Sequence, residues 1–263
     1  MYSVEMELAE RRNFRDVATL PMLDTDGKSL LCLGKIYRMG KLYKLAPEEV
    51  DYIEKLGITD IFDLRSDNER RAEPDAEIPS ARMHHLDFSG GLLGLEHVMD
   101  LYRKAAENPS DIDGEAYILE SYRKIPEICS DQVRTAVELI TNAENPRVLI
   151  HCAGGKDRTG FLIAVLLGSV GISEELILQD YMCSKRSKNT DDQVLKRYLK
   201  RFAAYGIDVP PEVAKPFLTV DKRALAGVLD QIKSRYGCVN QYLQDAAGLP
   251  KWRISRLQEW LIC

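Results

Sequence analysis

The stretch VLIHCAGGKDRTGFLIAVLL, residues 148–167, is apolar at both ends and polar in the middle. Its first three residues form a continuous apolar run, which is typical of a strand buried on both faces, and the residues from Thr159 onward resemble a buried helix. Residues 152–158 then form a tight loop between a strand end and a helix start. Unpaired backbone N–H groups and the helix dipole attract anions there, and Gly154 and Gly155 allow successive N–H groups to turn inward.

The side chains of this loop carry the groups that phosphoryl transfer needs. Cys152 stands where the helix dipole and nearby cations favour thiolate over thiol, which makes it a candidate nucleophile. Arg158 can hold two phosphoryl oxygens with its fork of N–H groups, and Lys156 adds a second cation. Asp157 is the nearest carboxyl that can protonate a leaving group and later activate water. The predicted catalytic residues are Cys152, Asp157 and Arg158, and the predicted phosphate-binding residues are Ala153, Gly154, Gly155, Lys156, Asp157 and Arg158.

Three further residues are predicted to support this loop. His151 lies behind the nucleophile, where we expect it to orient the loop by hydrogen bonding. Thr159 can hydrogen-bond the sulfur or assist its departure. Asp63 follows another apolar strand, and α/β folds place their chemistry at strand ends, so it competes with Asp157 for the proton role. Further alternatives for that role are Asp87, Asp111 and Asp113.

Two other kinds of site fit the sequence poorly. A nucleotide-binding loop needs Ser or Thr after GK, but Lys156 is followed by Asp157. A metal site formed by His84, His85 and His97 lacks ligand spacing, because adjacent strand residues point to opposite faces. We therefore predict no metal and no cofactor. The basic run KRSK at residues 185–188 is interpreted as a solvated helix end.

The composition is that of a soluble globular protein, with 263 residues of which 45% are hydrophobic and 29% charged. A net charge of −5 argues against nucleic acid as a partner. The N-terminus is acidic where a secretory signal needs a basic flank, and the longest apolar segment, residues 161–171, is too short to cross a bilayer. Six cysteines without CxxC pairs indicate a reducing compartment. We expect a cytoplasmic protein without stable membrane insertion, and its oligomeric state stays open.

The order of the apolar segments predicts a single α/β domain over residues 1–263, with a central, mostly parallel sheet flanked by helices. Strands are expected within residues 35–45, 58–66, 82–88 and 147–150. Residues 88–126 are glycine-rich, acidic and partly helical, and they form a candidate lid. Residues 173–263 are expected to be a helical cover.

The segment HCAGGKDRTG, residues 151–160, resembles the signature of cysteine-dependent phosphatases of the protein tyrosine phosphatase superfamily. Within that superfamily it is similar to a bacterial and fungal group whose loop reads HCxxGKDRTG. Other marks of this group are RNFRDVA at residues 12–18, LGITDIFDLRS at 56–66, YILESYRKIP at 117–126 and YGCVNQYL at 236–243. The resemblance covers nearly the whole chain.

The resemblance implies a tyrosine-phosphatase-like fold, with Cys152 as nucleophile, Arg158 as phosphate clamp and Asp157 as general acid. It implies Asp63, in the DLRS segment, as the second choice for a proton role. The expected substrates are phosphotyrosine, phosphoserine or phosphothreonine in proteins, and phosphoinositides. Between Phe88 and Ala116 the chain is shorter than the mycobacterial member of the group, and Ala153 replaces an aromatic residue found there.

The sequence thus predicts a phosphomonoesterase that forms a phosphocysteine intermediate on Cys152. Two alternatives stay open. One is a catalytically silent module that only binds phosphate, which would not need a nucleophile. The other is a thiol enzyme of the rhodanese or arsenate-reductase type, which also uses a cysteine loop.

Overall fold

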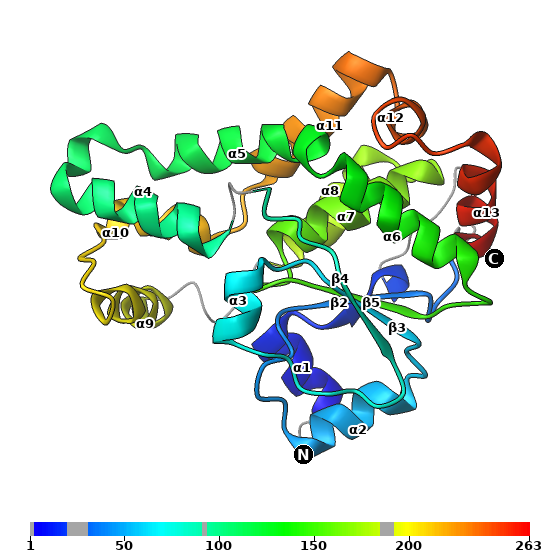
Figure 1. Ribbon diagram of the computed structural model, residues 1–263, viewed down its shortest axis with the longest axis horizontal. Coiled ribbons are helices and arrows are strands. Elements are labelled where there is room, and N and C mark those ends of the chain that lie inside the picture. Colours follow the sequence, from blue (N-terminus) through cyan, green and yellow to red (C-terminus); the bar gives the residue numbers. More distant parts are fainter. Residues whose placement is uncertain (1–2, 20–30, 91–93, 185–191) are drawn as a thin grey trace.

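The computed structural model describes residues 3–19, 31–90, 94–184 and 192–263 (Figure 1). The strands are β1 (Arg15–Asp16), β2 (Ile36–Met39), β3 (Asp60–Asp63), β4 (Arg82–His85) and β5 (Val148–His151). The helices are α1 (Val4–Arg12), α2 (Pro47–Lys55), α3 (Asp67–Ala72), α4 (Leu95–Glu107), α5 (Gly114–Ile128), α6 (Ser130–Asn142), α7 (Asp157–Ser169), α8 (Glu174–Met182), α9 (Asp192–Ala203), α10 (Pro211–Leu218), α11 (Lys222–Tyr236), α12 (Val239–Asp245) and α13 (Lys251–Leu261). Two 3-10 turns, η1 (Val17–Thr19) and η2 (Pro109–Asp111), complete the described elements. The run KRSK lies outside the described residues.

The strands form one sheet in the order β1-β2-β5-β3-β4. Only β1 pairs antiparallel, with β2, so the prediction of a mostly parallel sheet is confirmed. The last residue of β5, His151, lies opposite Met39 of β2 and Asp63 of β3. The carboxyl ends of the three central strands therefore meet at one edge, and the 152–158 loop leaves the sheet there.

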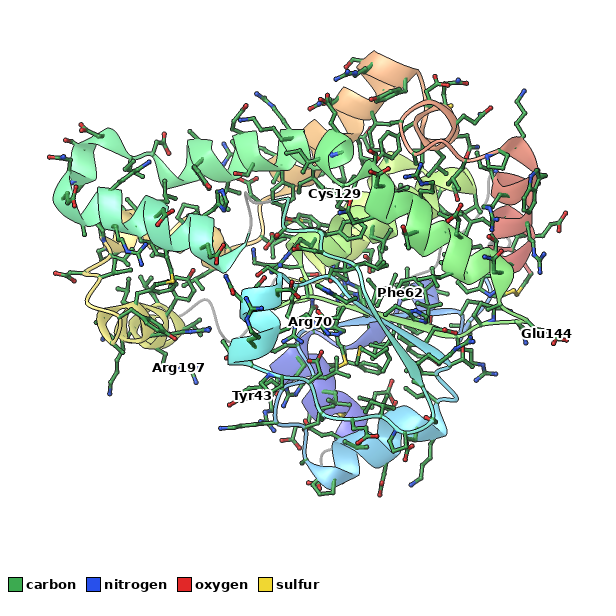
Figure 2. The ribbon with its side chains drawn as sticks, in the orientation of Figure 1. Tyr43, Phe62, Arg70, Cys129, Glu144 and Arg197 are labelled. Atoms are coloured by element: carbon green, nitrogen blue, oxygen red, sulfur yellow. A yellow bond between two sulfur atoms is a disulfide. The ribbon has the colours of Figure 1, made fainter. Side chains whose placement is uncertain are left out.

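Alternate residues of the strands enter two separate hydrophobic cores. Phe62 and Ile150 point into the first core, which is formed with α5 to α8 and α11 to α13, whereas Ile61 and Leu149 point into a second core closed by α1 and α2. Figure 1 shows α1 and α2 on one side of the sheet and α6, α7 and α8 on the other. In Figure 2, Phe62 marks the sheet and Cys129 the junction of α5 and α6 in the first core.

A third cluster lies apart from the sheet and joins α4, α9 and α10; we call these three helices the arm (Figure 1). Its centre is Tyr102 of α4, whose ring contacts the rings of Phe202 at 4.9 Å and Phe217 at 5.3 Å between centroids. The candidate lid, residues 88–126, contains α4 and most of α5. Its first helix packs with two helices from the C-terminal part of the chain, which the sequence pattern did not predict.

The apolar helix after the loop is buried, and this holds for every residue from Thr159 to Leu167. The side chains of residues 161–167 belong to the first core, which explains why the run is apolar. Among the described residues, no helix combines the length and the apolar character needed to span a bilayer.

The cysteine pattern indicated a reducing compartment, where disulfides are rare, but Cys32 and Cys263 form a disulfide. The two residues are 231 positions apart, so no local spacing signals the bond. They meet because the C-terminus runs beside residues 31–32: Leu31 and Ile262 form a β-bridge, and the Cys32 N–H donates to the Leu261 carbonyl. The four other cysteines are free.

Candidate active site

The 152–158 loop reverses the chain between β5 and the start of α7 at Asp157. Gly155 has a φ of +65°, and a Cβ at this position would lie 2.3 Å from the carbonyl carbon of Met39. Only glycine accommodates both the left-handed backbone and this close approach. The loop is therefore pressed directly against β2, with its amides at the N-terminus of a buried helix.

A buried polar network holds the back of the loop. The Gly155 carbonyl accepts hydrogen bonds from Asn13 Nδ2 at 2.7 Å and from Arg38 Nη2 at 2.8 Å. Asp180 of α8 accepts from Arg38 and, at 2.9 Å, from Arg15 Nε. Arg38 is fully buried, and Asp180 is 1% exposed. Residues from three distant segments thus fix one loop carbonyl, which determines where the loop N–H groups point.

Cys152 lines a pocket of about 380 Å³ between the loop and the arm. Cys152 has a free thiol and is 2% exposed. The apolar wall of the pocket is formed by Val98, Ile118, Val194, Tyr198, Phe202, Phe217, Leu218 and Val220. The cations that line it are Arg11, Arg12, Lys41, Lys156, Arg158 and Arg201, and the acids are Glu69, Glu73 and Asp157. The pocket therefore combines an apolar wall with more cationic than acidic side chains.

Arg158 is held by a two-pronged ion pair with Glu69 of α3. Nη1 and Nη2 donate to the two carboxylate oxygens at 2.6 and 2.8 Å. Burial alone would lower the pKa of Arg158, but the Glu69 carboxylate and the nearby Cys152 and Asp157 raise it above its ordinary value. Among the hydrogen bonds of the described residues, Nε and one N–H of Nη2 are unused. Arg158 is thus charged and oriented, with one edge of its fork available for an anion.

Asp157 is the carboxyl that shares the pocket with Cys152. Lys156 Nζ donates to both of its oxygens, at 2.7 and 2.6 Å, and the Tyr122 hydroxyl of α5 donates to Oδ1. The side chain is 24% exposed. It can therefore reach both solvent and a bound ligand.

Asp63 lies at the same sheet edge but is not part of the pocket lining. Its oxygens accept from Arg65 Nε and Nη2, both at 2.8 Å, and Arg65 Nη2 also contacts Asp75 at 2.5 Å. Burial alone would raise the pKa of Asp63, but the hydrogen bonds of Arg65 and the charges of His151 and Arg65 lower it to about 2. Asp63, Asp75 and His151 lie close enough to hold a metal ion, but the Arg65 guanidinium already supplies a cation to both carboxylates.

The predicted hydrogen bonds of His151 and Thr159 are not formed among the described residues. Both ring nitrogens of His151 are buried without a hydrogen bond, and Nε2 lies 3.4 Å from Asp75 Oδ2 as a charge contact. Thr159 Oγ1 is likewise buried and unpaired. His151 therefore contacts the Asp63 and Asp75 carboxylates rather than orienting the loop directly.

The remaining candidates lie elsewhere. Asp87, Asp111 and Asp113 do not line the pocket; Asp113 caps α5, and Asp87 accepts from the Ser89 N–H at 2.8 Å. His84 contacts Asp60 at 2.8 Å, and His85 contacts the Arg65 carbonyl at 2.8 Å. The three histidines considered for a metal thus have no common centre. Burial, with the charge of Asp87, raises the pKa of the Cys129 thiol to about 12, so this cysteine stays a thiol.

Glu69 and Tyr122 were not predicted as parts of the site. Residues 66–69 fit the S-x-x-E capping pattern, and the capping box is formed, but this pattern predicts only a helix start. Tyr122 lies within the YILESYRKIP segment, which the family resemblance marked without assigning a role. The contact between Arg38 and Asp180 spans 142 residues and has no local signal.

Comparison with known proteins finds relatives over most of the chain. The tyrosine phosphatase family matches residues 6–263. The triple specificity protein phosphatase PtpB of Mycobacterium tuberculosis is 28% identical over 282 residues, covering 97% of this chain and 98% of that protein. A putative tyrosine-protein phosphatase of Cupriavidus necator is 30% identical over 219 residues, covering 81% of this chain and 74% of its own. A tyrosine-protein phosphatase of Nostoc commune is 27% identical over 230 residues, covering 84% and 72%.

The chain therefore belongs to the tyrosine phosphatase family. The prediction of a cysteine-dependent phosphatase, an enzyme of the hydrolase class, is confirmed.

Proposed function

We propose that this chain is a phosphomonoesterase that hydrolyses phosphotyrosine through a phosphocysteine intermediate. The observation that carries the proposal is the position of Cys152, which lines the same pocket as Asp157 and Arg158, the first two residues of α7. An anion bound there would meet the loop amides, the positive end of the helix dipole and the unused edge of Arg158. Its phosphorus would then lie above the sulfur.

In the first step, Cys152 Sγ attacks phosphorus, a P–S bond forms, and the P–O bond to the phenol breaks. The non-bridging oxygens gain negative charge, which Arg158 and the loop amides stabilise without rearranging. Asp157 gives its proton to the departing phenolate oxygen. In the second step a water molecule attacks phosphorus, the Asp157 carboxylate takes its proton, and the P–S bond breaks. Inorganic phosphate leaves, and Cys152 returns to the thiolate.

We assign the proton transfers to Asp157 rather than to Asp63 on the basis of their surroundings. Asp157 lines the pocket and is partly exposed, so it can exchange a proton with substrate and with water. Asp63 is 1% exposed and its carboxylate is bound by Arg65. With a pKa near 2, Asp63 holds no proton to give at neutral pH.

The pocket walls support an aromatic phosphate as substrate. The apolar wall, mostly from the arm, can pack against the ring of phosphotyrosine. Cations at the pocket, Arg11, Arg12, Lys41 and Arg201, suit acidic groups beside the phosphate, whether acidic side chains of a phosphoprotein or further phosphates of a phosphoinositide. We propose that residues 1–263 form one domain. Within it, the arm and the candidate lid, residues 88–126, would cover the bound substrate.

The test is hydrolysis of an aryl phosphate in the presence of EDTA by wild type and by Cys152→Ser. We expect the variant to lose at least about 10³-fold in kcat, because a hydroxyl is a far weaker nucleophile here. Rapid quenching of the wild type should trap a phosphate on Cys152. Equal rates for the two proteins would refute the mechanism. A panel of phosphotyrosine peptide, phosphoserine peptide and phosphoinositide vesicles then ranks the substrate classes.

The two alternatives from the sequence have their own measurements. A silent binding module would bind phosphate without turnover in the same assay. A rhodanese or arsenate-reductase activity would appear as sulfur transfer or arsenate reduction that exceeds phosphate release. The pairing of Asp157 with Cys152 in one pocket favours hydrolysis, because neither alternative needs a proton donor for a phenolate.

The cytoplasmic location predicted from the sequence is part of the proposal, and the Cys32–Cys263 bond provides its test. Thiol alkylation in intact cells, followed by mass spectrometry, reads the redox state of this pair. Alkylation of both cysteines would support a reducing compartment, and an intact disulfide would contradict it.

A further inference from the structure

The YILESYRKIP segment brings a buried phenol to the reacting carboxylate. Tyr122 lies on α5 and is fully buried, and its hydroxyl donates to Asp157 Oδ1 across a separation of 35 residues. The Tyr181 hydroxyl of α8 lies 2.7 Å from the Tyr122 hydroxyl. A Cβ at Gly160 would lie 2.8 Å from the Tyr181 ring, so the glycine of the signature allows this tyrosine to pack against α7.

The two phenols form a hydrogen-bond chain with a fixed direction. Each hydroxyl has one proton, so Tyr122 can donate to the carboxylate only if Tyr181 donates to Tyr122. Burial, together with the charge of Asp157, raises the pKa of both tyrosines above the ordinary value. Both therefore remain protonated over the whole working range, and the chain runs from Tyr181 through Tyr122 to Asp157.

The hydrogen bonds to Asp157 distinguish its two oxygens. Oδ1 accepts from both Tyr122 and Lys156, which occupies both of its lone pairs, whereas Oδ2 accepts from Lys156 alone. The transferable proton is then carried by Oδ2. Tyr122 also prevents rotation of the carboxyl group, which would otherwise exchange the two oxygens.

We infer that Tyr122 is a positioning residue for proton transfer, which fixes the Asp157 carboxyl so that Oδ2 serves the leaving group, and that Tyr181 sets the direction of its hydroxyl. This inference rests on the proposed role of Asp157 in the reaction. Five titratable side chains interact with Asp157, and Cys152 lines the same pocket; the five are Lys156, Arg158, Tyr122 of α5, Tyr181 of α8 and Tyr198 of α9. Among the hydrogen bonds of the described residues, only Lys156 and Tyr122 donate to its carboxylate.

The test compares Tyr122→Phe with Tyr242→Phe. Tyr242 is the matched control because it is also fully buried in the first core and donates its hydroxyl to Pro126 of α5 at 2.7 Å, away from the pocket. For Tyr122→Phe we expect kcat to fall by about tenfold with phenyl phosphate, a poor leaving group, and by less than about twofold with p-nitrophenyl phosphate. The alkaline limb of the kcat profile should move to higher pH, because a donor that favours the carboxylate over the acid has been removed. Inhibition by inorganic phosphate should not change.

A second experiment combines Tyr122→Phe with Asp157→Asn and measures the hydrolysis of phenyl phosphate. If the phenol acts through this carboxyl, the two changes together should slow phenyl phosphate no more than Asp157→Asn alone. Tyr181→Phe, which keeps the Tyr122 hydroxyl, should shift the leaving-group dependence in the same direction by a smaller factor, and it serves as the test should Tyr122→Phe not fold.

The outcomes separate the two proposals. An active Cys152→Ser refutes the phosphocysteine mechanism itself. An inactive Cys152→Ser, together with a Tyr122→Phe profile and leaving-group dependence like those of Tyr242→Phe, overturns the positioning role alone. A uniform loss with both leaving groups and an unchanged pH limb also overturns it, because a merely structural defect gives that result.

Discussion

Replacing Glu69 by glutamine tests whether the orientation of Arg158 is set by its ion pair. The wild-type pair has two charge-assisted hydrogen bonds of 2.6 and 2.8 Å, and the two side chains are only 11% and 6% exposed. Glutamine keeps one acceptor oxygen but places an NH₂ group, a donor, against an N–H of the arginine. At least one charge-assisted bond is lost, which is worth about 1.5–3 kcal/mol, and the full loss of a buried pair sets an upper bound of about 3–5 kcal/mol.

We therefore expect Glu69→Gln to lower the free energy of unfolding by about 2–4 kcal/mol in urea titrations. We expect kcat/KM for p-nitrophenyl phosphate to fall by about 10- to 100-fold, since each decade corresponds to about 1.4 kcal/mol of lost transition-state stabilisation. The inhibition constant for inorganic phosphate should rise in parallel, because the same fork binds both ligands.

The control is Glu127→Gln. It removes the exposed ion pair between Glu127, at the C-terminal end of α5, and Arg235 of α11. Exposed pairs of this kind contribute about 0–1 kcal/mol, so this variant should resemble wild type in both measurements. If Glu69→Gln loses stability but keeps kcat/KM within about twofold of wild type, the ion pair is only structural and the reasoning about Arg158 is refuted.

Three further predictions concern the loop, its surroundings and the chain ends. Gly155→Ala should lower the free energy of unfolding by about 3 kcal/mol and kcat/KM by at least about tenfold, because its Cβ would meet the backbone of β2; wild-type kinetics would contradict this. Arg65 lowers the pKa of Asp63 to about 2. The ionised Asp63 carboxylate therefore stabilises the folded protein fully above about pH 4, and this contribution is lost as pH falls towards 2. That loss amounts to about 2 kcal/mol, and it should be missing from the acid unfolding curve of Asp63→Asn. Cys263→Ser, like dithiothreitol treatment, should remove the bond to Cys32 and about 2–5 kcal/mol of stability without changing the rate of aryl phosphate hydrolysis; a slower reaction would show that the bond supports the site.

The strand, loop and helix of the signature could be predicted because the determinants are local. Three apolar residues before Cys152, two glycines and an apolar run of helix length define the order of elements, and β5 and α7 follow that order. The parallel sheet follows from alternating strands and helices, which leave few other topologies. Of the helices after residue 173, five were predicted within a few residues, and the one expected over 173–184 is α8 at Glu174–Met182. The prediction of a loop over residues 205–216 was wrong, because α10 (Pro211–Leu218) forms there.

What could not be predicted depends on contacts between distant segments. Glu69 reaches Arg158 across 89 residues, and Asn13 reaches the Gly155 carbonyl across 142. Neither distance leaves a period or a spacing in the sequence. The arm is a further example, because α4 and α9 lie far apart in the sequence and pack together only in the folded chain.

The charged residues behind the loop contribute more to the conformation of the loop than to the stability of the fold. Arg38, Arg15 and Asp180 are taken out of water, and a well-packed apolar replacement of such a cluster is often neutral or stabilising. No apolar side chain can donate to the Gly155 carbonyl, however, and without Arg38 only Asn13 Nδ2 would donate to it among the hydrogen bonds of the described residues. A carbonyl bound by one donor instead of two is less firmly held in its orientation. The cluster thus keeps the amides, rather than the carbonyls, directed at the place where the phosphate is proposed to bind.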